Sequence, residues 1–388
     1  MPVTLNELLQ PQVITDTISK LSTKKGTYLT RLFGMQLGGG NKKEVPTRYA
    51  SFRVNNHVRE PMSGRAPGTG PAVIAPNPMG EQRVAMARFH EKMILDYEQL
   101  GNLSPIVGPN AQIDEGGQDY IAKQIEHQVD KGNASLDVLV AGLIRGALYL
   151  AQSGDNWVPY LTSQGGTEIT VDFQIPAANK TQLNMLAAGN IIGTSWDNPA
   201  APIVKNILKV NEAFINLNGM PFRNLLVDST VFGHIITNTE VRNVGGTVQS
   251  PFDSFTYDQA RDVDGNVMAG KMTAKLRAVP WLDIHIIDDV LSIGGTDPVY
   301  STGTGTLTKV VPATVGVFLP PIEKSWVQMW HGGEYISEDV GKPAAMKKGF
   351  QMWKSHGIEP TTISLLALLN ALPCLYREKA IAYGTVVF

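Results

Sequence analysis

The longest helical pattern of apolar positions lies between Asn133 and Gln152. Its apolar residues recur at spacings of four and three, as they do on one face of a helix: Leu136, Val140, Leu143, Ala147 and Leu150. Further apolar residues widen this face until most of the surface is apolar, which is typical of a buried helix. We predict a buried helix that is capped by Asn133 and ends at Gly154, with Gly142 and Gly146 as points of close packing.

Two charged residues inside this pattern, Asp137 and Arg145, argue against a membrane span. Each costs about 2.5–3.5 kcal/mol at the centre of a bilayer, whereas each Leu, Ile or Val returns only about 0.3–0.6 kcal/mol. The apolar residues do not offset the two charges, so we expect no membrane-spanning segment.

The chain before this helix divides into an arm and a second helical pattern. Residues 1–47 show no core of their own, and such a segment usually lies across another part of a protein. Asp114 to Lys131 is a modest amphipathic helix, and we predict that Lys131–Gly132–Asn133 bends the chain into the apolar helix.

A period of two replaces the helical pattern from Arg48 onward. Ala50, Phe52 and Val54 alternate with polar residues, and a second alternating run covers Glu81 to Phe89. The stretch between these strands, Arg59 to Gly80, is rich in proline and glycine. A long irregular excursion of this kind is either a disordered insertion or a functional arm.

Arginines favour the arm, because arginine suits paired polar interfaces. The candidate contacts with another subunit are charged residues of the excursion and its flanking strands: Arg53, Arg59, Glu60, Arg65, Arg83 and Arg88.

The second half of the chain reads as a separate α/β unit from Asn179 to about Asp339. The patterns predict two helices and three strands: Ile203–Leu217, Ser229–Thr237, Asn224–Asp228, Trp281–Asp288 and Ala313–Leu319. We also predict a turn-rich link at Asp155–Gly166, a strand at Glu168–Ile175 and a surface loop at Gly245–Asp264. The last block, Ile363 to Phe388, is strand-like and interrupted by Pro373.

Composition and motifs give little support to catalysis. The chain has 388 residues, a net charge of −2 and one cysteine, Cys374, which leaves no disulfide framework and no cysteine-based zinc site. Gly265 to Lys271 has phosphate-loop spacing, but Met272 stands where a hydroxyl must reach magnesium. The seven histidines lack metal-ligand spacing, and basic runs with interleaved aromatics are missing. We expect no catalytic residues, no cofactor and no metal site.

Four stretches and the C-terminus carry a resemblance to a known family. The stretches are Val54–Pro61, Leu139–Gly154, Trp281–Asp288 and Val310–Phe318. The C-terminal match comprises Trp353, Glu359–Pro360, Leu372–Pro373–x–Leu375 and Ala380 before a final strand. In these residues and in the order of its elements, the chain resembles the major capsid proteins of tailed bacteriophages, most closely the lambda-type major head proteins of the phage major capsid protein E family.

The resemblance implies an α+β fold of the HK97-like capsid type and a division of the chain into five parts. Residues 1–47 would be an N-terminal arm, 48–101 an extended loop that lies over a neighbouring subunit, and 102–178 a peripheral domain with a spine helix. Residues 179–340 would be the axial domain, which packs around five-fold and six-fold centres, and 341–388 would return to the peripheral domain.

The implied function is structural: a shell protein that assembles as pentamers and hexamers into an icosahedral head around double-stranded DNA. The implied partners are other copies of the chain, a separate scaffolding protein, a portal, a decoration protein at local three-fold points, and DNA bound non-specifically at the inner face. The implied location is the virion, after assembly in the host cytoplasm. Two alternatives stay open at this stage, the shell of a cellular nanocompartment with the same fold and an α/β enzyme built on residues 179–339.

Overall fold

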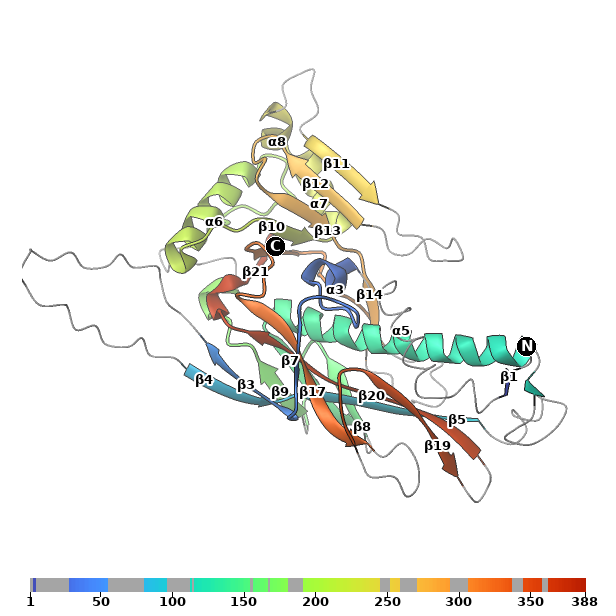
Figure 1. Cartoon of the computed structure of the whole chain (residues 1–388). Helices are drawn as coiled ribbons and strands as arrows, with labels where there is room; N and C mark the ends of the chain where they lie inside the picture. The colour runs from blue at the N-terminus through green and yellow to red at the C-terminus, as the bar shows by residue number, and fades with distance from the viewer. Residues whose placement is uncertain are drawn as a thin grey trace, which may run out of the picture.

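The fold is described from a computed structural model (Figure 1). It describes residues 3–4, 28–54, 80–95, 112–113, 115–153, 156–166, 168–180, 191–244, 252–258, 271–293, 306–336, 345–357 and 362–388. Two six-stranded sheets contain most of the described strands, and a long helix lies between the two sheets (Figure 1). We call them the lower and the upper sheet, after their places in Figure 1.

The long helix, α5, runs unbroken from Glu115 to Arg145. The predicted bend at Lys131–Asn133 and the predicted cap at Asn133 are therefore wrong. Gly132 does not break the helix but allows close packing, because an added Cβ would lie 2.9 Å from the ring of Phe350. Asn133 is buried, and its side-chain oxygen accepts a hydrogen bond from the backbone N–H of Leu37.

The predicted helix end at Gly154 is also wrong, because α5 ends at Arg145. Gly146 follows with φ +88°, a left-handed conformation that ends helices, and its N–H bonds to the carbonyl of Leu143. The apolar residues after it form a strand, β7 (Ala147–Ser153). Buried apolar residues at Leu148 and Leu150 suit a strand as well as a helix, so the short run was ambiguous in sequence.

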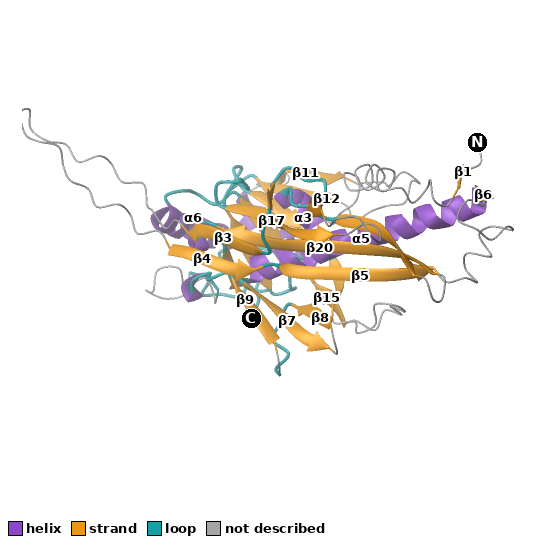
Figure 2. Ribbon diagram, turned by 60° about the horizontal axis from the view of Figure 1, so that its bottom comes forward, coloured by secondary structure: helices purple, strands orange, loops and turns teal. Residues whose placement is uncertain are grey.

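The lower sheet has six strands in the order β18-β17-β20-β19, with β2 also paired to β17 and β5 to β20. Their bounds are β2 Lys42–Val45, β5 Ala87–Leu95, β17 Val327–Ile336, β18 Ala345–Lys348, β19 Gln351–Gly357 and β20 Thr362–Leu375. Figure 2 shows β5 and β20 side by side beneath α5. Pro373 does not interrupt β20, because it lies opposite Met329, whose N–H points away from β20 and bonds to the carbonyl of Asn41, just before β2.

The upper sheet has the order β11-β12-β13-β10-β16-β21. Its strands are β10 Asn224–Val227, β11 Phe252–Asp258, β12 Lys271–Leu276, β13 Asp283–Ile286, β16 Val315–Leu319 and β21 Ala382–Thr385. Helices α6 (Ile203–Asn218), α7 (Ser229–Thr237) and α8 (Thr239–Val244) accompany it. The two predicted helices and three predicted strands are confirmed within a few residues, but the predicted surface loop at Gly245–Asp264 is wrong because β11 occupies part of it.

Smaller elements complete the fold. A three-stranded sheet has the order β8-β7-β9, with β8 at Asn156–Tyr160 and β9 at Glu168–Asp172, so the predicted link at Asp155–Gly166 contains a strand. Three two-stranded sheets are β1 (Val3–Thr4) with β6 (Gln112–Ile113), β3 (Tyr49–Val54) with β4 (Gly80–Ala85), and β14 (Val290–Ile293) with β15 (Thr306–Lys309). The short helices are α3 (Tyr28–Phe33) and the 3-10 turns η1 (Ala177–Asn179) and η2 (Glu378–Ala380).

Two large hydrophobic cores correspond to the two sheets. The first contains α3, α5, the lower sheet and one face of the upper sheet, to which Leu226 and Val317 belong, and the second lies between α6, α7 and the other face of the upper sheet. The chain crosses between them: β17, inside the predicted segment 179–340, belongs to the lower sheet, and β21, inside 341–388, belongs to the upper sheet. Within the described ranges, no helix is long and apolar enough to cross a membrane.

Candidate assembly surface

The strands that flank the predicted excursion form a two-stranded ribbon, which we call the arm ribbon, whereas residues 55–79 between them lie outside the described residues. Its strands β3 and β4 pair antiparallel, from Tyr49 opposite Ala85 to Val54 opposite Gly80. Because side chains alternate along a strand, one face of the ribbon carries Ala50 and Phe52, which are buried on the lower sheet. On the other face Tyr49 is 50 % exposed, so the ribbon has an inner face covered by its own subunit and a free outer face.

Aromatic packing fixes the inner face of the arm ribbon. The Phe52 ring meets the rings of Trp330 and Tyr376 edge-on, at centroid distances of 6.2 and 5.9 Å. The Trp330 indole N–H donates to the Tyr376 hydroxyl at 2.7 Å. Gly332, beside Trp330, lets the chain approach closely, because an added Cβ would lie 2.9 Å from the carbonyl oxygen of Thr47.

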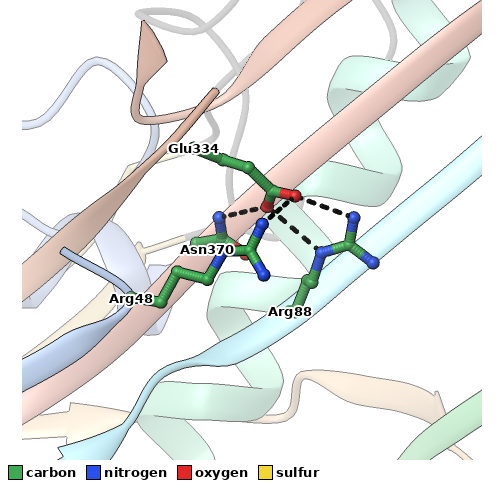
Figure 3. A network of polar contacts seen from close by, with 4 residues as sticks. All are labelled: Arg48, Arg88, Glu334 and Asn370. Atoms are coloured by element: carbon green, nitrogen blue, oxygen red, sulfur yellow. Dashed lines mark hydrogen bonds and ion pairs between the residues drawn. The ribbon is translucent and has the colours of Figure 1, made fainter. Parts of the chain in front are cut away.

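At the base of the arm ribbon one carboxylate binds the residue before β3 and a residue of β5, the strand that follows the ribbon (Figure 3). Glu334 on β17 accepts from Arg48 at 2.6 Å, from Arg88 at 3.1 and 3.2 Å, and from the Asn370 amide at 3.0 Å. Burial would raise the pKa of Glu334, but the hydrogen bonds from Arg88 and Asn370 and the charges of the two arginines lower it below its usual value. We call these four residues the base cluster.

The base cluster lies where the arm ribbon separates from the lower sheet. Met86 stands between β4 and β5, and its N–H bonds to the carbonyl of Arg48 at 3.0 Å. On the N-terminal side of Met86, β4 pairs with β3 in the arm ribbon. On its C-terminal side, β5 pairs with β20 in the lower sheet. Arg48 therefore holds one strand of the ribbon, Arg88 holds the chain that returns from it, and Glu334 joins both to the sheet.

The structure places the predicted contact residues in different settings. Arg83 is exposed on the outer face of the arm ribbon, with its guanidinium 4.8 Å from the centre of the Tyr49 ring, and Arg53 stands opposite Glu81. Arg88 binds Glu334 of its own chain. The other three predicted residues lie outside the described residues: Arg59, Glu60 and Arg65.

Sequence reasoning missed Arg48, Glu334 and Asn370. Arg48 and Glu334 are 286 positions apart, and no local pattern connects them. The one available signal was a carboxylate, Glu334, within a largely buried strand, since buried carboxylates are paired.

The described residues show little catalytic chemistry. No group of three or more His, Cys, Asp or Glu in these ranges is placed to hold a metal ion. Burial raises the pKa of the Cys374 thiol far above its usual value, which keeps it un-ionised. His285 is buried between the Tyr28 hydroxyl at 2.6 Å and the Asn224 side-chain oxygen at 2.9 Å, and so has a structural role.

Comparison with solved structures identifies the fold. A protein described as a prophage capsid protein from E. coli has a TM-score of 0.56 and 14% sequence identity, and the alignment covers 100% of this chain and 99% of that one. A phage-related protein from Bordetella bronchiseptica has a TM-score of 0.51 and 11% identity, with 96% of each chain covered. The architecture is the HK97-like capsid fold, of the α+β class, as predicted.

Comparison of sequences identifies the family. No curated protein matches the chain. The family model described as "Phage major capsid protein E" matches residues 11–248, which include the arm ribbon, α5 and the helices of the upper sheet. The chain therefore belongs to the phage major capsid protein E family, and it is a structural protein of the phage capsid shell.

Proposed function

We propose that this capsid protein assembles as pentamers and hexamers into an icosahedral head that encloses double-stranded DNA. The observation that carries this proposal is the arm ribbon. Its inner face is fixed to its own subunit by aromatic packing and the base cluster, while its outer face presents Tyr49 and Arg83 to solvent. Exposed tyrosine and arginine together are typical of protein interfaces. A ribbon held rigidly at its base, with a free outer face, is suited to lie over a second copy.

The proposed division of labour follows the predicted segments. The arm 1–47 and the extended loop 48–101 reach neighbouring copies, the peripheral domain 102–178 carries the spine helix, and the axial domain 179–340 packs around five-fold and six-fold centres. The segment 341–388 returns to the peripheral domain. The second core supports the axial unit, because nearly all of its residues lie between Ile192 and Phe318. Strands β17 and β21 cross between the two sheets.

The proposed partners are those of a head that is built and then filled. A separate scaffolding protein and a portal act during assembly in the host cytoplasm, and a decoration protein binds at local three-fold points. Packaged DNA contacts the inner face weakly and without sequence preference, because a chain with a net charge of −2 and no concentrated basic run has little means of binding phosphates tightly.

Removing the excursion tests the proposal. A chain that lacks Pro61 to Pro78 should keep the helical content and thermal unfolding of the wild type but form no closed shells by negative-stain microscopy. Removal of Ser163 to Gly166, an exposed turn between β8 and β9, is the control deletion and should leave shells intact. Arg83→Glu should weaken assembly, whereas Lys123→Glu, an equally exposed change on α5, should not.

The possible results of these experiments distinguish the proposed functions. Normal shells from the shortened chain would remove the arm from the assembly mechanism. A wild-type chain that stays monomeric with scaffolding protein present would overturn the shell proposal itself. Small shells that exclude a genome would indicate a nanocompartment.

A further inference from the structure

Helix α6 presents large apolar side chains to solvent. Its buried face contributes Ile203, Ile207, Val210 and Phe214 to the second core. On the opposite face Leu208 and Ile215 are 48 % and 43 % exposed, and their spacing of seven residues places them on one stripe. Exposed Lys205, Lys209 and Glu212 surround this stripe. We call these five residues the helix flank.

The pair β14–β15 presents a second apolar surface. Its inner face carries Leu291 and Ile293, which are buried in the first core. The register pairs Val290 with Lys309 and Ser292 with Leu307, so Val290 and Leu307 share the outer face. They are 49 % and 74 % exposed. With Asp288, Lys309 and Asp228 they form what we call the strand flank.

The two flanks carry opposite net charge. The helix flank has two lysines and one glutamate, so its formal charge is +1. In the strand flank the Lys309 ammonium lies 2.6 Å from Asp228, and its pKa is raised first by that hydrogen bond and also by the charge of Asp228 and Asp288. The buried Asp228 carboxylate offsets the Lys309 ammonium, and the exposed Asp288 carboxylate leaves a formal charge of −1 there. Each flank therefore matches the other in both apolar content and charge.

The flanks lie on different sides of the molecule, with α6 at the left of the upper unit in Figure 1 and β14 at its right. A surface that matches a different surface of the same chain makes a head-to-tail contact, and such contacts form a ring when the rotation between neighbouring copies closes. We propose that the helix flank of one copy docks on the strand flank of the next copy around each rotational centre. This inference rests on the proposed assembly into pentamers and hexamers and names the surfaces that make it.

Each flank contributes only two large apolar side chains, which is too few to hold two free subunits together stably. Stable interfaces bury about 1,200–2,000 Å² in total, and this pair of flanks is only part of such an area. In a ring, however, every copy uses both flanks, and the last contact forms between parts that are already held together. The contact is therefore weak between two free subunits and strong in a closed ring.

Cross-linking in assembled particles tests the contact. The chain with Leu208→Cys and Leu307→Cys is assembled and treated with a short bismaleimide, and the products are separated under denaturing conditions. The native Cys374 is buried and should not react. We expect the monomer band to be lost to a ladder that ends at five and six chains. Each single cysteine variant should stay monomeric, because a head-to-tail contact brings different residues together.

The controls separate this inference from the proposed function. The pair Leu208→Cys with Ile169→Cys, whose second residue is 47 % exposed on β9, should give no ladder. Particles without a ladder from the Leu208/Leu307 pair would overturn the assigned contact and leave the shell function intact. Cross-linked dimers from one single variant would show a symmetric contact and also overturn it. Absence of five- and six-fold rings in wild-type particles would overturn the proposed assembly itself.

Discussion

Single residues decide how the arm ribbon is held. Glu334 is 9 % exposed, whereas the side chains of Arg48 and Arg88 are 60 % and 46 % exposed. A buried carboxylate with two arginines and an amide satisfies its acceptors fully, and its loss leaves the arginines without their anion. The base cluster therefore contributes both stability and a fixed direction for the ribbon.

The first prediction concerns this carboxylate. Glu334→Gln should lower the free energy of unfolding by about 1–3 kcal/mol, because the negative charge is lost and the amide nitrogen at the Oε2 position would face the Arg88 and Asn370 donors. Glu44→Gln is the matched control, since Glu44 is exposed and its nearest ion-pair atom, on Lys42, is 3.8 Å away; it should change stability by less than about 0.5 kcal/mol. Chemical denaturation of unassembled subunits measures both, and equal effects would contradict the role of the base cluster.

A second residue, His331, predicts a dependence on pH. It is 2 % exposed on β17, neither ring nitrogen has a hydrogen-bond partner in the described part of the chain, and burial lowers its pKa to about 4. The unfolded chain binds the proton near pH 6.5, so stability falls as pH drops from 6.5 towards 4 and levels off below that. The total loss is about 3 kcal/mol.

His331→Met removes the titrating group and keeps an apolar side chain of similar size. Between pH 6.5 and 4 the variant should lose about 3 kcal/mol less stability than the wild type. Chemical denaturation at pH 7, 5.5 and 4 gives the comparison. The same pH dependence in both proteins would assign the acid sensitivity to other groups. Glu334 acts in a more acidic window, because its contribution is present above about pH 4.5 and is lost as pH falls through its lowered pKa.

Elements meet where glycine allows backbone to approach backbone. At Gly332 the arm ribbon leaves the lower sheet, and an added Cβ would lie 2.8 Å from the Met86 sulfur and 2.9 Å from the carbonyl oxygen of Thr47. The sulfur belongs to a flexible side chain and can move, but the carbonyl is fixed in the chain that leads into β3. The position therefore sets the distance between the base of the ribbon and β17.

Gly332→Ala should destabilise the fold by about 1–3 kcal/mol through this overpacking and should also reduce shell assembly by tilting the ribbon. Gly233→Ala in α7 is the contrasting variant, because nothing lies within 4 Å of its added Cβ. It should stabilise the protein by about 0.5–1 kcal/mol, the usual gain inside a helix. Thermal unfolding distinguishes the two, and a neutral Gly332→Ala would show that the ribbon base has room to shift.

At the scale of the molecule, α3 joins the two cores. Leu29 and Phe33 pack in the first core, and the Tyr28 hydroxyl reaches His285 of the upper sheet at 2.6 Å. Asn224 donates its amide to Pro320 and offers its oxygen to His285, so the imidazole carries its proton on Nε2 and accepts from Tyr28 on Nδ1. The hydrogen-bond series thus runs from α3 into two strands of the upper sheet.

Tyr28→Phe should break this connection at a cost of about 1–2 kcal/mol. Hydrogen exchange should become faster in β10 and β13, while β20, in the other core, keeps its wild-type protection. Tyr376→Phe, which removes a hydroxyl from the lower sheet only, is the matched control and should leave β10 and β13 unchanged. Uniform acceleration throughout the chain would instead show that the two cores open as one unit.

The sequence by itself determined most element types and the order that carries the family resemblance. Periods of 3.6 and 2 depend only on neighbours along the chain, so α6, α7, β10, β13, β16 and the arm strands could all be read from them. Two positions could not be predicted from the sequence. The residues after Gly146 form β7, because the left-handed turn at Gly146 ends the helix. Lys131–Asn133 continues the helix, because Gly132 packs against Phe350.

Only the tertiary structure decided which residues work together. The base cluster joins positions 48, 88, 334 and 370, and the cores take β17 and β21 from segments that sequence order assigns to the other unit. Contacts between residues that are hundreds of positions apart leave no local sequence pattern. An arginine that binds a buried carboxylate therefore cannot be distinguished in the sequence from any other surface arginine. Periodicity fixes which side of an element is apolar, and packing alone fixes what that side meets.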